Sequence, residues 1–225
     1  MLGSGRIGTL AGAAERLAKT HPDVPVIGSV TGPISTAASI VDPMQFLKEL
    51  RKEREGANRV LDYVSDFLVA FAGVLVESGA TAICIGDPTA TGEILGPKMF
   101  SDYAVTYLNK VIDGIHATGV PVLVHICGEM KAVKPSIPLL RADAISTDAF
   151  VNLRLLKEEY PQLTTMGNVS TFLLELGDGQ GGSPYGRAGA RRHRYHFTRL
   201  RSEHRVTDFK YPGHDLGCEG ARLRW

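Results

Sequence analysis

The sequence predicts an α/β fold whose strands form one parallel sheet. Between residues 23 and 177, short apolar segments alternate five times with segments of helical spacing. The apolar segments lack polar alternation, which is typical of strands covered on both faces of a parallel sheet. Successive parallel strands need a crossover connection, and the helical segments supply it. A closed β/α barrel and an open doubly wound sheet are therefore the two candidate architectures.

Each element of this pattern can be placed in chain order. The five predicted strands are Val24–Val30, Thr81–Pro88, Val120–Gly128, Ala142–Asp148 and Leu163–Val169. The predicted helices are Pro43–Gly79, Met99–His116, Val133–Leu140, Leu155–Tyr160 and Ser170–Gly177. Gly79 ends the first of these helices as a C-terminal glycine does. No Gly-x-Gly-x-x-Gly motif follows the first strand, so a dinucleotide-binding sheet loses its best support.

Composition excludes several classes of function. The chain has 225 residues, 44% of them hydrophobic, and a formal net charge of +1. Such a balanced charge argues against binding to nucleic acid or to a membrane surface through bulk electrostatics. No apolar run is long enough to span a bilayer, and the first residues lack the apolar region of a signal peptide. Three cysteines are too few for a disulfide framework, so we expect a reducing, cytoplasmic location.

Polar residues follow the predicted strands at the point where each strand ends. They are Thr31, Asp87, His125, Cys127, Asp148 and Asn168. In both candidate architectures, residues just past the carboxyl ends of the strands form the functional site. We therefore expect these side chains to lie on one rim of the molecule. Asp87 and Asp148 are equally compatible with helix capping, and for Asn168 capping is the somewhat commoner role.

The pair His125 and Cys127 ends the third predicted strand. Residues two apart in a strand face the same side, so both side chains project together. An imidazole nitrogen and a thiolate at this spacing can bind one Zn²⁺, although a catalytic zinc needs a third protein ligand and an open position. Taken alone, the motif is more often structural, because buried cysteines commonly act as small apolar residues. Cys84, between Ile83 and Ile85, fits that packing role.

Several phrases of the sequence together resemble a known family. They are "VTGPISTAASI" from Val30, "DPTATGEILGPKMF" from Asp87, "HICG" from His125, "ADAISTD" from Ala142 and "MGNVST" from Met166. In this order they resemble the uroporphyrinogen decarboxylase superfamily. They are most similar to its zinc-dependent branch, the methylcobamide:coenzyme M methyltransferases and related corrinoid methyltransferases. The resemblance covers roughly residues 25 to 177.

The resemblance implies a (β/α)8 barrel of the TIM type and a specific chemistry. It implies zinc held by His125, Cys127 and a second cysteine far downstream. It implies transfer of a methyl group from a methylcobamide, carried by a partner corrinoid protein, to a small thiol such as coenzyme M. Zinc would deprotonate that thiol. The alternative within the superfamily is a uroporphyrinogen decarboxylase acting on a tetrapyrrole without metal, and "HICG" is the form of the zinc branch.

The remaining site predictions concern residues around this zinc. We expect Asp87 and Asp148 to act in catalysis at the barrel mouth. We expect Thr31, Glu93 and Asn168 to contact substrate. A carboxylate can fill the open metal position when substrate is absent, and Asp87, Glu93 and Asp148 are the candidates for that position.

The pattern predicts an incomplete barrel, because it supplies about five strand–helix units where eight are needed. Residues 1–177 are expected to form a partial barrel domain whose start is missing. Residues 178–225 are rich in Gly, Arg and His, which favours a disordered basic tail or a shifted reading frame. Read one nucleotide later, codons 193–205 can encode an apolar strand with Cys at the position of Leu200. Cys218 would then be a coincidental substitute, and an inactive fragment is a further alternative.

Overall fold

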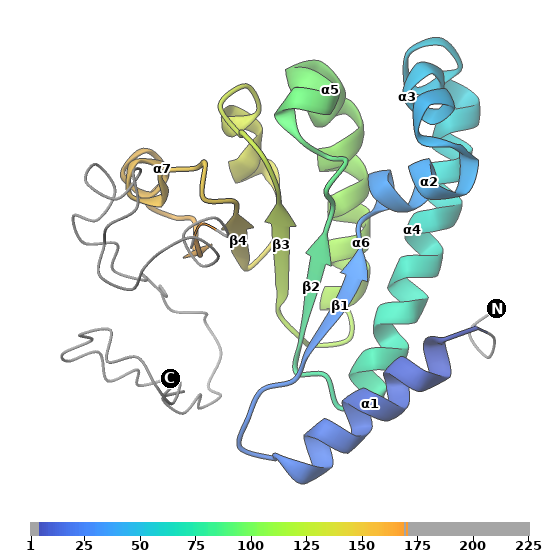
Figure 1. The fold of residues 1–225 in the computed structure, drawn as a ribbon, viewed down its shortest axis with the longest axis vertical. Helices are drawn as coiled ribbons and strands as arrows, with labels where there is room; N and C mark the ends of the chain where they lie inside the picture. Colours follow the sequence, from blue (N-terminus) through green and yellow to red (C-terminus); the bar gives the residue numbers. More distant parts are fainter. Residues whose placement is uncertain (1–4, 169, 171–225) are drawn as a thin grey trace.

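The computed structural model describes residues 5–168 and residue 170. Its five strands form one parallel sheet in the order β1-β2-β3-β4-β5 (Figure 1). The strands are Ile27–Thr31 (β1), Ala82–Gly86 (β2), Val122–Ile126 (β3), Ala144–Thr147 (β4) and Thr165–Met166 (β5). The order never reverses, whereas a doubly wound sheet has a point where it does. The parallel α/β prediction is confirmed, and the order is that of a barrel segment.

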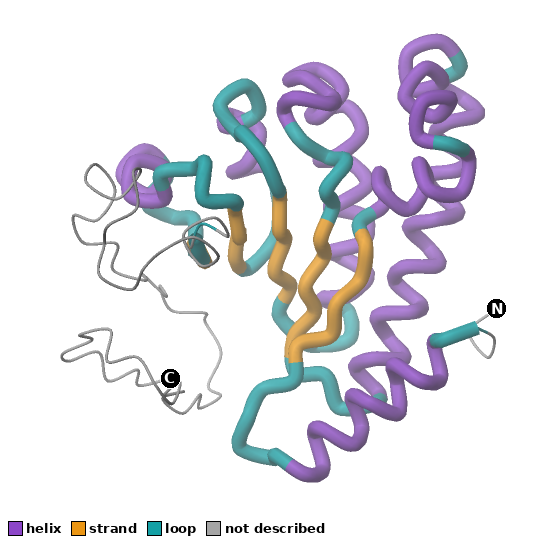
Figure 2. Tube along the Cα trace, viewed as in Figure 1, coloured by secondary structure: helices purple, strands orange, loops and turns teal. Residues whose placement is uncertain are grey.

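Helical segments connect the strands, as parallel pairing requires. The α-helices are α1 (Ile7–Thr20), α2 (Pro33–Val41), α3 (Pro43–Lys52), α4 (Arg54–Glu77), α5 (Gly92–Met99), α6 (Thr106–His116) and α7 (Leu153–Glu159). A π-helical turn, η1 (Phe100–Val105), joins α5 to α6, and a 3₁₀ segment, η2 (Lys134–Leu139), precedes β4. Figure 2 shows a helix or helical turn in every connection between successive strands. Helix α4 packs on β1 and β2, and α6 packs on β3 and on α4.

The sheet has one closely packed face and one open face. Ile83, Ile85, Val124 and Ile126 point toward the helices and are completely buried. The opposite face, which would line the interior of a barrel, holds a smaller apolar cluster around Leu123. On β1 this inner face is exposed along the whole strand. The prediction of strands covered on both faces therefore holds for the central strands and fails for β1.

Two helical segments differ from the sequence prediction for local reasons. The stretch from Pro43 to Gly79 contains two helices, because Glu53 leaves the helical region with φ −129° and ψ 62°. Asp42 begins α3 by accepting a hydrogen bond from the Gln45 N–H at 2.9 Å. Helix α5 begins at Gly92, seven residues before the helix predicted at Met99. Two glycines and a proline mask its helical spacing in the sequence.

Several predictions lie outside the described residues. They concern the helix Ser170–Gly177, the tail 178–225, Cys218 and the shifted reading frame. Among the residues that the structure describes, no helix is both long and apolar enough to cross a membrane.

Candidate metal site at the carboxyl edge of the sheet

One row of residues crosses the sheet at its carboxyl edge. Thr31 pairs with Gly86, Gly86 with His125, and His125 with Ser146 in the parallel register. Neighbours in such a row face the same side of the sheet, and adjacent strands lie about 4.8 Å apart. Because Val124 and Ile126 face the helices, this row lies on the open inner face. The register thus brings Thr31 and His125, two of the predicted strand-end residues, to a common rim.

The side chains of His125 and Cys127 converge on this rim. The His125 Nε2 atom lies 3.2 Å from the Cys127 Sγ atom, and both residues are partly buried. A nitrogen and a sulfur bound to one tetrahedral zinc at their usual bond lengths lie roughly 3.5 Å apart. The two atoms therefore have the separation that adjacent positions of a zinc ion require. The donor set, one imidazole and one thiol, also suits zinc.

Ser146 fixes the orientation of the His125 ring. The His125 Nδ1 atom lies 3.0 Å from the Ser146 Oγ atom, so Nε2 is left to face Cys127. Histidines that bind metals commonly have a hydrogen-bond partner on the other ring nitrogen. Sequence reasoning missed Ser146 as a site residue. Its position two residues before Asp148 was the available signal, because residues at that spacing share a face of the strand.

Two effects act on the Cys127 thiol. Burial, and then the negative charge of Asp148, raise the pKa of Cys127 above its ordinary value. The structure therefore places Asp148, the residue after β4, within electrostatic reach of Cys127. A bound divalent cation has the opposite effect, because it favours the thiolate. Without a cation, the thiol keeps its proton at neutral pH.

Glu93 reaches the same loop from the first turn of α5. Gly128 follows Cys127 with a φ of +71°, a region that glycine adopts without strain. A Cβ atom on Gly128 would lie 3.0 Å from Oε2 of Glu93, so the glycine also permits a close approach of that carboxylate. Glu93 is exposed, and its carboxylate borders the rim from the side of α5.

Asp87 is placed differently from the other predicted site residues. Its side chain is completely buried, and its oxygens accept hydrogen bonds from the N–H groups of Ile34 and Ser35, both at 2.9 Å. The Ser35 hydroxyl donates a third bond at 2.6 Å. Asp87 therefore caps the amino end of α2 across the sheet from its own strand. The expectation that it lines the open pocket is not met, because no part of its side chain is exposed.

Thr31 and Asn168 lie at opposite ends of the rim. Thr31 is exposed, and its carbonyl accepts a hydrogen bond from Thr36 Oγ1 at 3.3 Å. The Asn168 amide donates to the carbonyls of Asp148 and Val151, both at 2.7 Å. These bonds engage both amide hydrogens in holding the loop after β4. Contact between Asn168 and a substrate stays a prediction, and only its Oδ1 atom is open to such a contact.

A complete metal centre is not formed by the described part of the chain. Within it, no three His, Cys, Asp or Glu residues are grouped closely enough to hold a metal ion. Cys84 is on the inner face of β2 and pairs with Leu123, one row away from His125. The third ligand implied by the family resemblance therefore has no counterpart among residues 5–168.

The comparisons with known proteins agree with this arrangement of strands. The sequence profile described as uroporphyrinogen decarboxylase (URO-D) matches residues 2–181. The chain belongs to the URO-D family. Its fold is accordingly the α/β barrel type of that family, of which the described residues form five strands and the helical connections between them.

Several similar curated proteins are methyltransferases. A methylcobamide:CoM methyltransferase MtbA of Methanosarcina mazei is 33% identical over 174 residues, which cover 77% of this chain and 48% of the relative. A methylcobamide:CoM methyltransferase MtaA of Methanosarcina barkeri is 32% identical over 51% of this chain and 33% of its own length. A uroporphyrinogen decarboxylase of Myxococcus xanthus is 31% identical, covering 63% and 42% of the two chains.

A solved structure shows the same relation. A methyltransferase from Methanosarcina mazei superposes with a TM-score of 0.70 and 25% sequence identity. The match covers 75% of this chain and 50% of that chain. The URO-D family chain thus spans about half the length of the relatives that it matches.

Proposed function

We propose that this chain belongs to a methyltransferase that moves a methyl group from a methylated corrinoid protein to a zinc-activated thiol such as coenzyme M. The convergence of His125 Nε2 and Cys127 Sγ, 3.2 Å apart on the inner face, is the observation that supports it most strongly. The names of the similar methylcobamide:CoM methyltransferases support the same reaction.

In this proposal His125 and Cys127 hold the zinc. When bound, zinc would supply the positive charge that keeps a substrate thiol deprotonated at neutral pH. Ser146 holds the His125 ring so that Nε2 faces Cys127. The remaining positions are filled by the substrate, by a neighbouring carboxylate or by groups outside the described residues, because the described residues hold no preassembled set of three ligands.

The other rim residues act on the substrate. Asp148 and Glu93 place negative charge beside the ligand pair, and Thr31 lies exposed two strands from His125. We assign to these groups the positioning of the thiol and of the methyl donor. The two carboxylates are also the candidates for the open metal position. Asp87 acts at a distance, by holding the amino end of α2 beside the rim.

Metal binding by the full 225-residue chain tests the site directly. Added Co²⁺ is expected to give thiolate-to-cobalt charge-transfer absorption, which is lost in Cys127→Ser and in His125→Ala. Cys84→Ser is the matched control, because Cys84 is on the same inner face one row away and should leave the absorption unchanged. Absorption that survives in Cys127→Ser would contradict the site.

Activity assays distinguish the proposed methyl transfer from decarboxylation, the other reaction considered for this family. The family profile and the Myxococcus xanthus relative favour decarboxylation of uroporphyrinogen as the second candidate. The proposal expects methylated thiol from methylcobalamin and coenzyme M, dependent on Cys127, and no release of carbon dioxide from uroporphyrinogen. Carbon dioxide release that persists in Cys127→Ser would favour the decarboxylase.

A further inference from the structure

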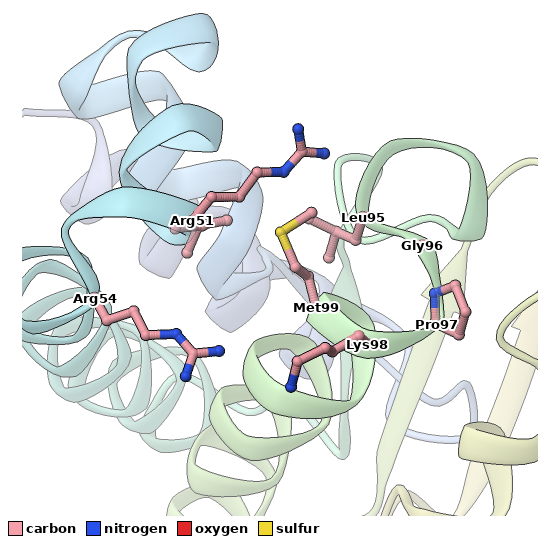
Figure 3. A pocket seen from close by; sticks show the side chains of 8 residues that line it. Arg51, Arg54, Leu95, Gly96, Pro97, Lys98 and Met99 are labelled. Atoms are coloured by element: carbon pink, nitrogen blue, oxygen red, sulfur yellow. The ribbon is translucent and has the colours of Figure 1, made fainter.

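A cleft of about 450 Å³ lies between the junction of α3 with α4 and the helix α5 (Figure 3). Leu50 and Leu95 lie beneath it and are almost fully buried in the main core. The apolar surface that stays accessible in the cleft comes from Pro97, which is exposed, and Met99, which is partly exposed. The cleft shares no residue with the candidate metal site.

The polar side chains that line this cleft are all cationic. Arg51 of α3, Arg54 of α4 and Lys98 of α5 extend around it in Figure 3. Arg54 and Lys98 share one carboxylate, that of Asp102, at 3.1 and 2.9 Å. Arg51 has no ion-pair or hydrogen-bond partner within the described part of the chain. Three cations with one carboxylate leave an excess of two positive charges at the cleft.

The walls of the cleft are held in place by contacts between elements. The Tyr103 hydroxyl, in the π-helical turn η1, donates to the Leu50 carbonyl at 2.7 Å and is buried. Gly96 has φ 66° and ψ 171°, a conformation that is essentially restricted to glycine. Pro97 then fixes the following turn. The cationic groups therefore extend from walls that are fixed relative to one another.

A second cleft beside α3 and α4 provides an internal comparison. It has a similar volume, about 480 Å³, and an apolar surface that includes Val60 and Val64. Its charged lining is mixed, with Glu49 and Glu53 opposite Arg59. Arg59 is also paired with Glu55 at 2.8 Å. The lining of the first cleft is therefore positively charged, whereas the lining of the second cleft is not.

We propose that the cleft around Arg51 binds an organic anion, namely a phosphate or carboxylate group attached to an apolar body. The unpaired Arg51 guanidinium presents a fork of N–H donors that matches such groups in a bidentate manner. Arg54 and Lys98 add charge from the opposite walls. The apolar surface between them binds the rest of the molecule, so charge and apolar contact act together.

Phenyl phosphate is the probe for this site, titrated calorimetrically into the full chain. Inorganic phosphate tests the charge alone and phenol tests the ring alone. We expect saturable binding of phenyl phosphate that is about tenfold tighter than that of either half. Raising the salt concentration should weaken it, because the cationic groups are solvent-exposed.

Substitutions in the two clefts test where phenyl phosphate binds. Arg51→Gln is expected to weaken phenyl phosphate binding about tenfold, and Lys98→Gln should weaken it as well. Arg59→Gln, which removes an arginine that is also exposed from the second cleft, should leave the affinity for phenyl phosphate unchanged. Circular dichroism of each variant verifies the fold. Absence of phenyl phosphate binding, equal binding of phenol, or an unchanged affinity in Arg51→Gln would each overturn the proposal.

Discussion

At the scale of single residues, Asp87 combines full burial with a dense set of donors. Burial raises the pKa of Asp87 to about 6, although bonds from Ser35 and from the Ile34 N–H act in the opposite direction. An unfolded aspartate titrates near pH 3.9. Between about pH 4 and pH 6 the folded chain therefore binds more protons than the unfolded chain. By linkage, the contribution of this group to stability falls as pH rises through that window.

The Asp87→Asn variant isolates this effect. The wild-type chain should lose of the order of 3 kcal/mol of unfolding free energy, from this group alone, between about pH 4 and pH 6. The variant lacks that slope and is also less stable at low pH, because an amide NH₂ faces the N–H donor of Ile34. Urea unfolding at several pH values measures the difference between the two curves. A constant difference across the window would show that Asp87 does not titrate there.

Gly32 is the residue that allows Asp87 to approach α2. A Cβ atom at Gly32 would lie 2.4 Å from the Cβ atom of Asp87 and 2.5 Å from its Oδ2 atom. Gly32→Ala should therefore lower the unfolding free energy by about 1–3 kcal/mol through overpacking. Gly73→Ala is the control, because its Cβ atom would meet nothing within 4 Å inside α4 and should stabilise the chain by about 0.5–1 kcal/mol. Thermal unfolding measures both variants: the melting temperature should fall in Gly32→Ala and rise in Gly73→Ala.

Part of the site could be predicted at this scale. The period of two along a strand is sufficient to place His125 and Cys127 on one face. The same rule applied to "AIST" points to Ser146. The partner of Asp87 could not be predicted, because Ser35 is 52 residues away and is brought close only by the pairing of β1 with β2. Hydrogen bonds that depend on tertiary packing have no local signal in the sequence.

At the scale of elements, strands were easier to predict than short helices. Segments such as Val122–Ile126 are mostly apolar and rich in residues branched at Cβ, and their burial follows from that composition. Helices α2 and α5 are short; α2 contains Pro and Thr, and α5 contains Gly and Pro, residues that the propensity scale disfavours. Helix α2 depends on a tertiary contact, because Asp87 caps it from another strand, whereas α5 begins at a local cap in which the Thr91 hydroxyl accepts from the Ile94 N–H.

The link between α6 and the loop before β4 offers a test at the level of elements. The buried side chain of Asn109 donates to the Leu139 carbonyl at 2.9 Å and accepts from the Arg141 N–H at 2.8 Å. Asn109→Leu leaves both backbone groups without these partners and should cost about 2–3 kcal/mol of unfolding free energy.

Gln45→Leu is the matched comparison, because it removes an exposed bond to Glu49 and should change stability by less than about 0.5 kcal/mol. Chemical denaturation of both variants gives the two values. Equal effects would mean that water satisfies the backbone groups around Asn109.

At the scale of the whole molecule, the described sheet is open. Strands β1 and β5 each have a single strand neighbour among the described residues, and the inner face of β1 leaves Ile27 52% exposed. Unpaired strand edges with apolar side chains promote association between chains. The chain should therefore show an average mass that rises with concentration.

Ile27→Lys places a charge on that edge and should suppress the association. Val24→Lys is the control, because Val24 is similarly exposed but lies before the strand. Sedimentation velocity measures the mass distribution of each chain. An average mass that does not change with concentration in the wild type would contradict the expectation.

The uninterrupted order of the strands also bears on how the chain is made. Every strand from β2 to β5 pairs with the strand that was synthesised immediately before it. Strand pairing can therefore proceed during translation, because the strand to which each new strand pairs has already left the ribosome. A sheet with a reversed order would instead have to wait for later segments before its centre could form.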